Sequence, residues 1–194
     1  GDVIIFFSLL HQLNISIFYL INNNLNNYFL NLILPYLTNL GSIAVLLLIC
    51  VVLYVTGGKK EKKVALIAIL GLAIASLIVS LIKPIVGELR PFLVLQNVNL
   101  LVQEKGIYSF PSGHTSLAFT VATILGLSYK FKNISLIYIT LAIAAVVGFS
   151  RIYLGVHYPI DVLGGSGVGV LSCLAALKLG DYVFKNLGVY NGNY

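Results

Sequence analysis

Apolar runs separated by short polar breaks dominate the chain from residue 41 onward. The runs cover residues 42–56, 64–82, 114–129, 134–154 and 160–179. Each is close to the roughly 20 residues that a helix needs to cross a bilayer. The pattern therefore predicts five membrane-spanning helices in this part of the chain.

The first 40 residues are less regular. Residues 3–21 form a run long enough to cross a bilayer, but it is interrupted by His11, Gln12, Asn14 and Ser16. Residues 22–27 form a polar break, and residues 28–40 are short and contain Asn31, Pro35 and Asn39. We expect residues 3–21 either to span or to lie at the interface, and residues 28–40 to form an amphipathic surface helix or a re-entrant segment. We expect His11 to be an interfacial or hydrogen-bonded residue without a catalytic role.

The composition is that of a membrane protein. Hydrophobic residues make up 59% of the 194 residues, and the mean hydropathy of +0.98 exceeds what a soluble domain of this length would have. We therefore expect an all-α fold, a polytopic membrane helix bundle in which residues 1–194 form a single domain. It would have six transmembrane helices if residues 3–21 span, with an extra interfacial helix near the N-terminus. Cys50 and Cys173 fall inside predicted spans, which predicts two buried thiols.

The net charge of +6 comes largely from short loops. Residues 57–63 contain four Lys and one Glu, and residues 130–133 contain two Lys and no acidic residue. Because these basic residues are clustered in short loops between apolar runs and not on a soluble face, we do not expect a nucleic-acid partner. Both loops are short enough for the positive-inside rule, which predicts that they face the cytoplasm.

One stretch outside the basic loops collects an Arg, a His and an Asp within twelve residues, at Arg151, His157 and Asp161. Pro159 favours the first turn of a helix, so Arg151 should end one helix, His157 should lie in the connection, and Asp161 should begin the next helix. A carboxylate that holds one imidazole nitrogen leaves the other nitrogen free to attack, and Arg can bind an oxyanion. The same three residues could instead cap two helix ends and pair with one another.

Two further connections at the ends of apolar runs carry ionisable residues. Lys83 and Arg90 follow the run that ends at residue 82. His114 comes directly after Ser112 and Gly113 and before an apolar run, where the free N–H groups of a helix N-terminus favour an anion. One span separates each motif connection from a basic loop, so we expect the three connections to lie together on the external face. No Cys/His cluster has the spacing of metal ligands, and we expect no metal or other cofactor.

These three stretches resemble the signatures of the type 2 phosphatidic acid phosphatase superfamily of integral membrane lipid phosphatases. The signatures are Lys-x6-Arg-Pro, Pro-Ser-Gly-His and Ser-Arg-x5-His-x3-Asp. They match without departure at Lys83, Arg90, Pro91, Pro111, Ser112, Gly113, His114, Ser150, Arg151, His157 and Asp161. The resemblance covers about residues 60–180, and three motifs in this order are far more specific than any one of them.

The resemblance implies hydrolysis of a lipid phosphate ester or diphosphate through a phosphohistidine. His157 would be the nucleophile, Asp161 would orient and stabilise its ring, and His114 would protonate the leaving oxygen. The phosphate-binding groups would be Lys83, Arg90, Arg151 and the backbone N–H groups of Ser112 and Gly113. Glu88 and Glu104 are expected to be solvated loop residues.

The lipid substrate stays open at this point. The small size of the chain favours a polyprenyl diphosphate of the undecaprenyl or dolichyl type, and the alternatives are a phosphatidylglycerophosphate or phosphatidate phosphatase and a lipid phosphotransferase that uses the same residues. A transporter would place its ionisable residues near the middle of the spans instead of at their ends. The expected partners are the lipid phosphate and membrane lipids, and the expected location is a prokaryotic plasma membrane with the site facing outside.

Overall fold

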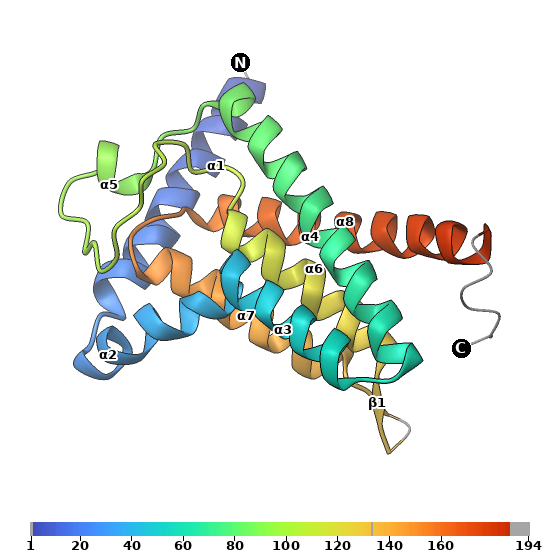
Figure 1. The fold of residues 1–194 in the computed structure, drawn as a ribbon. Helices are drawn as coiled ribbons and strands as arrows, with labels where there is room; N and C mark the ends of the chain where they lie inside the picture. Colours follow the sequence, from blue (N-terminus) through green and yellow to red (C-terminus); the bar gives the residue numbers. More distant parts are fainter. Residues whose placement is uncertain (1, 133, 187–194) are drawn as a thin grey trace.

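A computed structural model describes residues 2–132 and 134–186, which form a helix bundle (Figure 1). In chain order the elements are α1 (Asp2–Tyr19), the π-helical turn η1 (Leu20–Asn24), α2 (Tyr28–Leu37), the 3₁₀ turn η2 (Thr38–Gly41), α3 (Ile43–Thr56), α4 (Lys59–Val86), the single turn α5 (Pro91–Val94), α6 (Gly113–Ser128), β1 (Lys130–Phe131), β2 (Ile134–Ser135), α7 (Ile137–Tyr153) and α8 (Pro159–Asn186). The all-α class predicted from the sequence is therefore confirmed.

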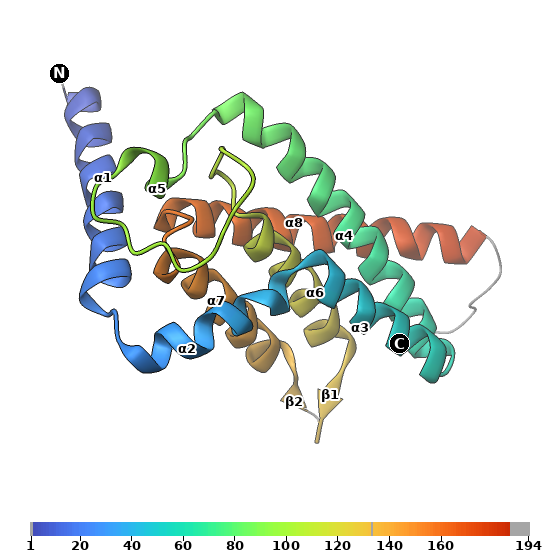
Figure 2. The same cartoon turned by 60° about the vertical axis from the view of Figure 1, so that its left-hand side comes forward.

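The central element is α6, which packs against α4, α7 and α8 (Figures 1 and 2). The main core cluster joins apolar residues of α3, α4, α6 and α8 and includes both cysteines, Cys50 and Cys173, which are fully buried. Four hydroxyl side chains of α6 are also buried, at Thr115, Ser116, Thr120 and Thr123. Each of them donates a hydrogen bond within the bundle, so the hydroxyl groups that this central helix buries are satisfied.

Two glycines allow α8 to approach α6 closely. A Cβ atom at Gly165 would lie 2.7 Å from the carbonyl oxygen of Ser112, and one at Gly169 would lie 2.5 Å from that of Ser116. This is the small-residue contact that their spacing favours in membrane helices. The contact brings the first turn of α8 beside the N-terminus of α6, where the amide of Ser112 donates to the carbonyl of Asp161 at 3.0 Å.

Three helices of the described part of the chain are long and apolar enough to cross a membrane: Ile4–Asn24, Lys59–Val86 and Pro159–Asn186. A fourth is added if Tyr28–Gly41 and Ile43–Thr56, which meet at a bend of 57°, count as one span. The six spans expected from the sequence are thus not confirmed. The shortfall comes from α6 and α7, since a helix of 16 or 17 residues is only about 25 Å long, against a hydrocarbon core of about 30 Å.

Helix α1 contacts the bundle mainly where the connection after α4 and the start of α8 lie. The hydroxyl of Tyr19 donates to the carbonyl of Gln96 at 2.8 Å, and the side chain of Asn14 accepts the amide of Ile160 at 3.0 Å. Seven large apolar side chains in the first part of this helix are exposed: Ile4, Ile5, Phe6, Phe7, Leu9, Leu10 and Leu13. An N-terminal helix long enough to span therefore lies against the end of the bundle that carries the motifs.

Two sequence expectations about element boundaries need correction. Residues 134–135 do not begin the helix α7, because they pair with Lys130 and Phe131 in a small hairpin and Ser135 accepts the amide of Ile137. The polar residues after 21 are not a simple break either. Asn22 is completely buried in η1, where its side chain bonds to the backbone of Asn99 and Tyr153.

The basic loops meet at the end of the bundle opposite the motifs. The ammonium group of Lys60 lies 5.0 Å from the centre of the Tyr129 ring, which joins the start of α4 to the end of α6. Lys63 pairs with Asp181 near the end of α8 at 3.0 Å. In Figure 1 these segments, together with β1, lie well away from the connection that contains α5. The two sets of ionisable residues recognised in the sequence are thus at opposite ends of the molecule.

Candidate active site

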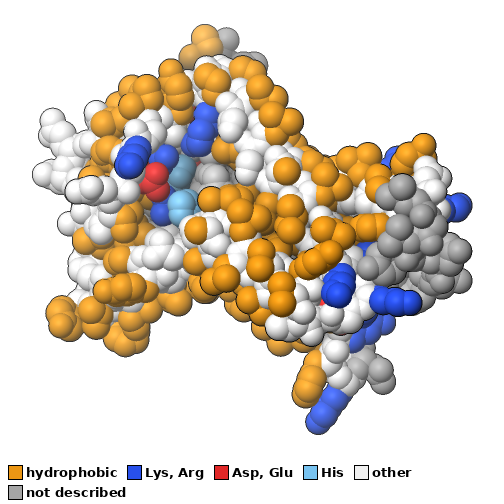
Figure 3. Space-filling model, in the orientation of Figure 1, with side chains coloured by type: hydrophobic (Ala, Val, Ile, Leu, Met, Phe, Trp, Pro, Cys, Tyr) orange, Lys and Arg blue, Asp and Glu red, His pale blue; other side chains and the backbone are white. Residues whose placement is uncertain are grey.

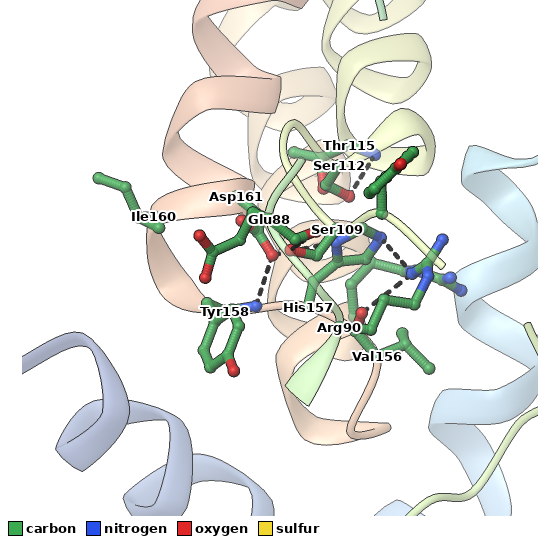
Figure 4. A network of polar contacts seen from close by, with 12 residues as sticks. Glu88, Arg90, Ser109, Ser112, Thr115, Val156, His157, Tyr158, Ile160 and Asp161 are labelled. Carbon is green, nitrogen blue, oxygen red and sulfur yellow. Dashed lines mark hydrogen bonds and ion pairs between the residues drawn. The ribbon is translucent and has the colours of Figure 1, made fainter. Parts of the chain in front are cut away.

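The connection between α7 and α8 positions a histidine beside a carboxylate. Helix α7 ends at Tyr153 and α8 begins at Pro159, as the sequence predicted. His157 and Asp161 are both buried, with Nδ1 of the ring 3.2 Å from Oδ2 of the carboxylate. That oxygen also accepts the backbone N–H of Tyr158 at 2.7 Å (Figure 4). Asp161 is thereby fixed in the first turn of α8, with one oxygen directed at the imidazole.

The second ring nitrogen of His157 faces an arginine. Its Nε2 atom lies 3.1 Å from Nη1 of Arg90. A guanidinium group can only donate hydrogen bonds, so Nε2 must accept and the proton must sit on Nδ1, where it is donated to Asp161. This assignment places the lone pair of the imidazole on Nε2, where it accepts the N–H of Arg90.

Charge and burial keep this imidazole neutral. Burial lowers the pKa of His157 well below its ordinary value of 6.5, and the nearby cations of Arg151, Arg90 and Lys83 lower it further. His114 acts on it in the same direction when charged. A neutral histidine next to several positive groups is suited to attack on an anion, because the anion neutralises the cations while the ring supplies the electron pair.

Arg90 lies in the connection after α4, and its guanidinium group reaches the ring of His157. Its Nε donates to the carbonyl of Gly106 at 2.6 Å and its Nη1 to that of Val156 at 2.9 Å. The next residue, Pro91, begins the short helix α5. These contacts tie the guanidinium to both the connection and the α7–α8 turn, so its orientation is set by backbone atoms.

Arg151 approaches from the last turn of α7 and is almost completely buried. Its Nη1 donates to the hydroxyl of Thr38 at 3.1 Å. Within the described residues its Nε atom has no hydrogen-bond partner. A buried guanidinium with an unused donor is costly unless another acceptor reaches it, and an anion in the site would supply that acceptor.

Glu104 corrects the sequence interpretation. We expected a solvated loop residue, but its carboxylate bridges the two arginines: Oε1 accepts from Nη2 of Arg151, and Oε2 lies 3.4 Å from Nη2 of Arg90. The side chain is only 19% exposed. A single glutamate in a long connection carries no sequence signal of this kind, because the fold of the connection alone decides which groups it meets.

The remaining groups that the sequence predicts to bind phosphate are Lys83 and the N-terminus of α6. The ammonium group of Lys83, in the last turn of α4, donates to the carbonyls of Tyr108 and Ser109 at 2.8 and 3.2 Å. Ser112 caps α6 by accepting the amide of Thr115. The amide of Ser112 donates to the backbone carbonyl of Asp161, so it is not available to an anion as the sequence leads us to expect.

The structure therefore brings the sequence-predicted residues of four elements to one end of the bundle. Figure 3 shows basic, acidic and histidine side chains gathered in a hollow on a face that is otherwise largely apolar. His11 lies elsewhere: it lines a pocket of about 390 Å³ with Glu88 and Tyr158, between α1 and the end of α4. Among residues 2–132 and 134–186, no group of three or more His, Cys, Asp or Glu side chains could hold a metal ion.

Comparison with known proteins identifies the family. The model of the PAP2 superfamily matches residues 64–185. The chain is 34% identical over 191 residues to the bacitracin transport permease protein BcrC of Bacillus licheniformis, across 92% of this chain and 88% of that protein. It is 31% identical over 153 residues to the undecaprenyl-diphosphatase of Sulfolobus acidocaldarius, across 78% and 71% of the two chains. The crystal structure of Aquifex aeolicus LpxE matches with a TM-score of 0.76 at 33% identity, across 86% of this chain and 95% of that one.

The matched segment contains the three motifs and, of the site side chains whose contacts are given in this subsection, all except Thr38. The fold, the motifs and the family match agree with one another. The resemblance recognised in the sequence is thus confirmed: the chain belongs to the PAP2 superfamily and is a membrane-embedded phosphatase of lipid phosphates.

Proposed function

We propose that this phosphatase removes the terminal phosphate of a polyprenyl diphosphate by way of a phosphorylated His157, with residues 1–194 acting as one domain. The observation that supports this most directly is the bonding of the His157 ring. Nδ1 is held by Asp161, and Nε2 accepts from Arg90, a group suited to bind the phosphate oxygens. The nucleophilic lone pair and the anion-binding group therefore face the same point.

In the first step Nε2 of His157 forms a bond to phosphorus while the bond from phosphorus to the bridging oxygen breaks. His114 gives a proton to that leaving oxygen, and the polyprenyl monophosphate departs. Asp161 stabilises the positive charge that develops on the His157 ring. Lys83, Arg90, Arg151 and the Gly113 amide hold the equatorial oxygens, where the transition-state charge is spread.

In the second step water attacks the phosphorus of phosphohistidine. His114 takes a proton from that water, the bond from phosphorus to Nε2 breaks, and inorganic phosphate leaves. A phosphotransferase would use the same residues with a lipid hydroxyl in place of water. His114 suits both steps, because the ring that donates a proton to the leaving oxygen in the first step can accept a proton from water in the second.

Two findings support a polyprenyl diphosphate as substrate. One relative that matches most of this chain is named for undecaprenyl diphosphate. The cationic groups are also numerous: Lys83, Arg90 and Arg151 can neutralise the several charges of a diphosphate better than one cation could.

The membrane orientation follows from the basic loops. The Lys-rich start of α4 and the hairpin after α6 face the cytoplasm under the positive-inside rule, so the site at the opposite end faces outside. In this arrangement α6 and α7 cross the bilayer although they are short. The orientation is the same whether α1 makes a sixth crossing or lies along the surface. A prokaryotic plasma membrane whose outer leaflet exposes a spent polyprenyl carrier is the setting that we propose.

Phosphate release from a panel of lipids tests the substrate. The purified chain in neutral detergent would be given undecaprenyl diphosphate, phosphatidylglycerophosphate and phosphatidate, with His157→Ala as the matched control. We expect the highest kcat/KM for the polyprenyl diphosphate and no release by the variant. A preference of about tenfold or more for a glycerol-based lipid would contradict the substrate. Phosphate found on an added acceptor lipid would instead indicate a transferase.

A further inference from the structure

The carboxylate of Glu104 occupies the donors that a substrate phosphate needs. Of the Arg90 guanidinium, Nε and Nη1 are engaged by carbonyls of the protein, and Nη2 is directed to Glu104. In Arg151, Nη1 is engaged by Thr38 and Nη2 by Glu104. The Nη2 atoms of both arginines thus share one protein anion, and the side chains of the two arginines are 6% and 2% exposed.

Although Nε of Arg151 is open, a phosphate can bind the Nη2 atoms of the two arginines only by displacing this carboxylate. Charge decides which phosphates can do so. A phosphodiester headgroup carries one negative charge, the same as Glu104, whereas a terminal phosphate carries between one and two near neutral pH because its second pKa is about 6. Against a tethered carboxylate that is already in place, a phosphodiester gains nothing in charge, while a terminal phosphate does.

The setting makes this competition relevant. A site at the end of a membrane helix bundle is surrounded by phospholipid headgroups, most of them phosphodiesters, and its substrate is a minor lipid among them. Two buried arginines without a partner would bind any of these headgroups. Excluding the abundant competitor is then as important for turnover as binding the substrate.

We propose that Glu104 is a specificity-determining residue, a built-in competitor that keeps phosphodiester headgroups off Arg90 and Arg151 and gives way to a terminal phosphate. The inference rests on the proposed role of the two arginines as phosphate ligands. Glu104 does not touch the reacting phosphorus in this account; it acts through the arginines, and it swings aside when the substrate binds.

The test compares Glu104→Gln with wild type and with Glu61→Gln, which makes the same charge change at the far end of the bundle. In Glu61→Gln an oxygen remains to accept the Gly58 amide that Glu61 now holds at 2.9 Å. Hydrolysis is measured in neutral detergent with increasing phosphatidylglycerol. We expect the phosphatidylglycerol concentration for half inhibition to fall about tenfold or more in Glu104→Gln, the size of one charge-assisted hydrogen bond. Equal inhibition of all three proteins would overturn the proposal.

A binding measurement tests the same proposal if Glu104→Gln folds but hydrolyses the substrate too slowly for an inhibition assay. Dimethyl phosphate, a phosphodiester without a tail, should raise the unfolding temperature of Glu104→Gln and leave that of wild type and Glu61→Gln unchanged. If inorganic phosphate raises it in Glu104→Gln and dimethyl phosphate does not, the competitor role is wrong and Glu104 only positions the arginines. If wild type neither hydrolyses any lipid phosphate nor responds to inorganic phosphate, the proposed function itself fails.

Discussion

His157 and Asp161 form a bonded pair across the start of α8: Nδ1 lies 3.2 Å from Oδ2, and the same oxygen holds the backbone amide of Tyr158 at 2.7 Å. Both groups that meet this oxygen are donors. An asparagine at position 161 could satisfy them with its own oxygen, but it has no charge to stabilise an imidazolium.

We expect Asp161→Asn to fold normally and to lose about 10²- to 10⁴-fold in kcat, by analogy with triad carboxylates. Steady-state phosphate release measures the loss, and the thermal unfolding midpoint checks the fold. A kcat within roughly threefold of wild type, in a protein of normal stability, would show that Asp161 has no part in the chemistry.

The three motifs made most of the site predictable from the sequence. The apolar runs indicate where the helices end, so the meeting of these motif residues at one end of the bundle could be anticipated. At the helix ends or in the connections beside them lie Lys83, Arg90, Arg151, His157 and Asp161. Pro159 marked the start of α8, because proline favours the first turn of a helix.

The remaining features depend on long-range packing. Glu104 meets its arginines only through the path of the connection between α4 and α6, which has no periodic pattern. Asn22 reads as part of a polar break but is buried, because it pairs with Asn99 and the carbonyl of Tyr153, residues far away in the chain. Thr38 touches Arg151 across 113 positions. A single sequence holds no local signal for such pairs.

The pH response of His157 is a second prediction. Its pKa lies well below 6.5, so the ring stays neutral as the pH falls past that value and gains a proton only at lower pH. NMR of protein with ¹³C-labelled histidine would follow the titration, with His157→Asn to assign the signal. We expect the His157 signal to remain that of a neutral ring at pH 6. A midpoint at or above 6.5 would contradict the neutral nucleophile.

Independence from metal ions is a third prediction. In our account Lys83, Arg90 and Arg151 supply the positive charge that Mg²⁺ provides in other phosphoryl-transfer enzymes. Activity should therefore be unchanged after dialysis against EDTA. Orthovanadate, which can adopt the geometry of the in-line transition state, should inhibit competitively. Loss of activity with EDTA and its recovery with Mg²⁺ would require a different arrangement of charge.

A fourth prediction concerns the side of the membrane. Single cysteines at Gln96, in the connection that carries α5, and at Lys59, at the start of α4, would be labelled in intact cells with a membrane-impermeant maleimide. Asn97 is less suitable because its φ of 55° is strained for cysteine. The native Cys50 and Cys173 are buried and serve as the unlabelled background. We expect labelling at position 96 alone; labelling at 59 alone would reverse the orientation.

The central claim is that phosphate passes through His157, and trapping the phosphorylated chain tests it most directly. Substrate labelled in its terminal phosphate would be mixed with enzyme and quenched in base within the first turnover, since phosphohistidine survives base and is lost in acid. The account predicts base-stable label on wild type and none on His157→Ala. Label on His157→Ala at the wild-type level, or wild-type turnover with no labelled chain at any time, would contradict it.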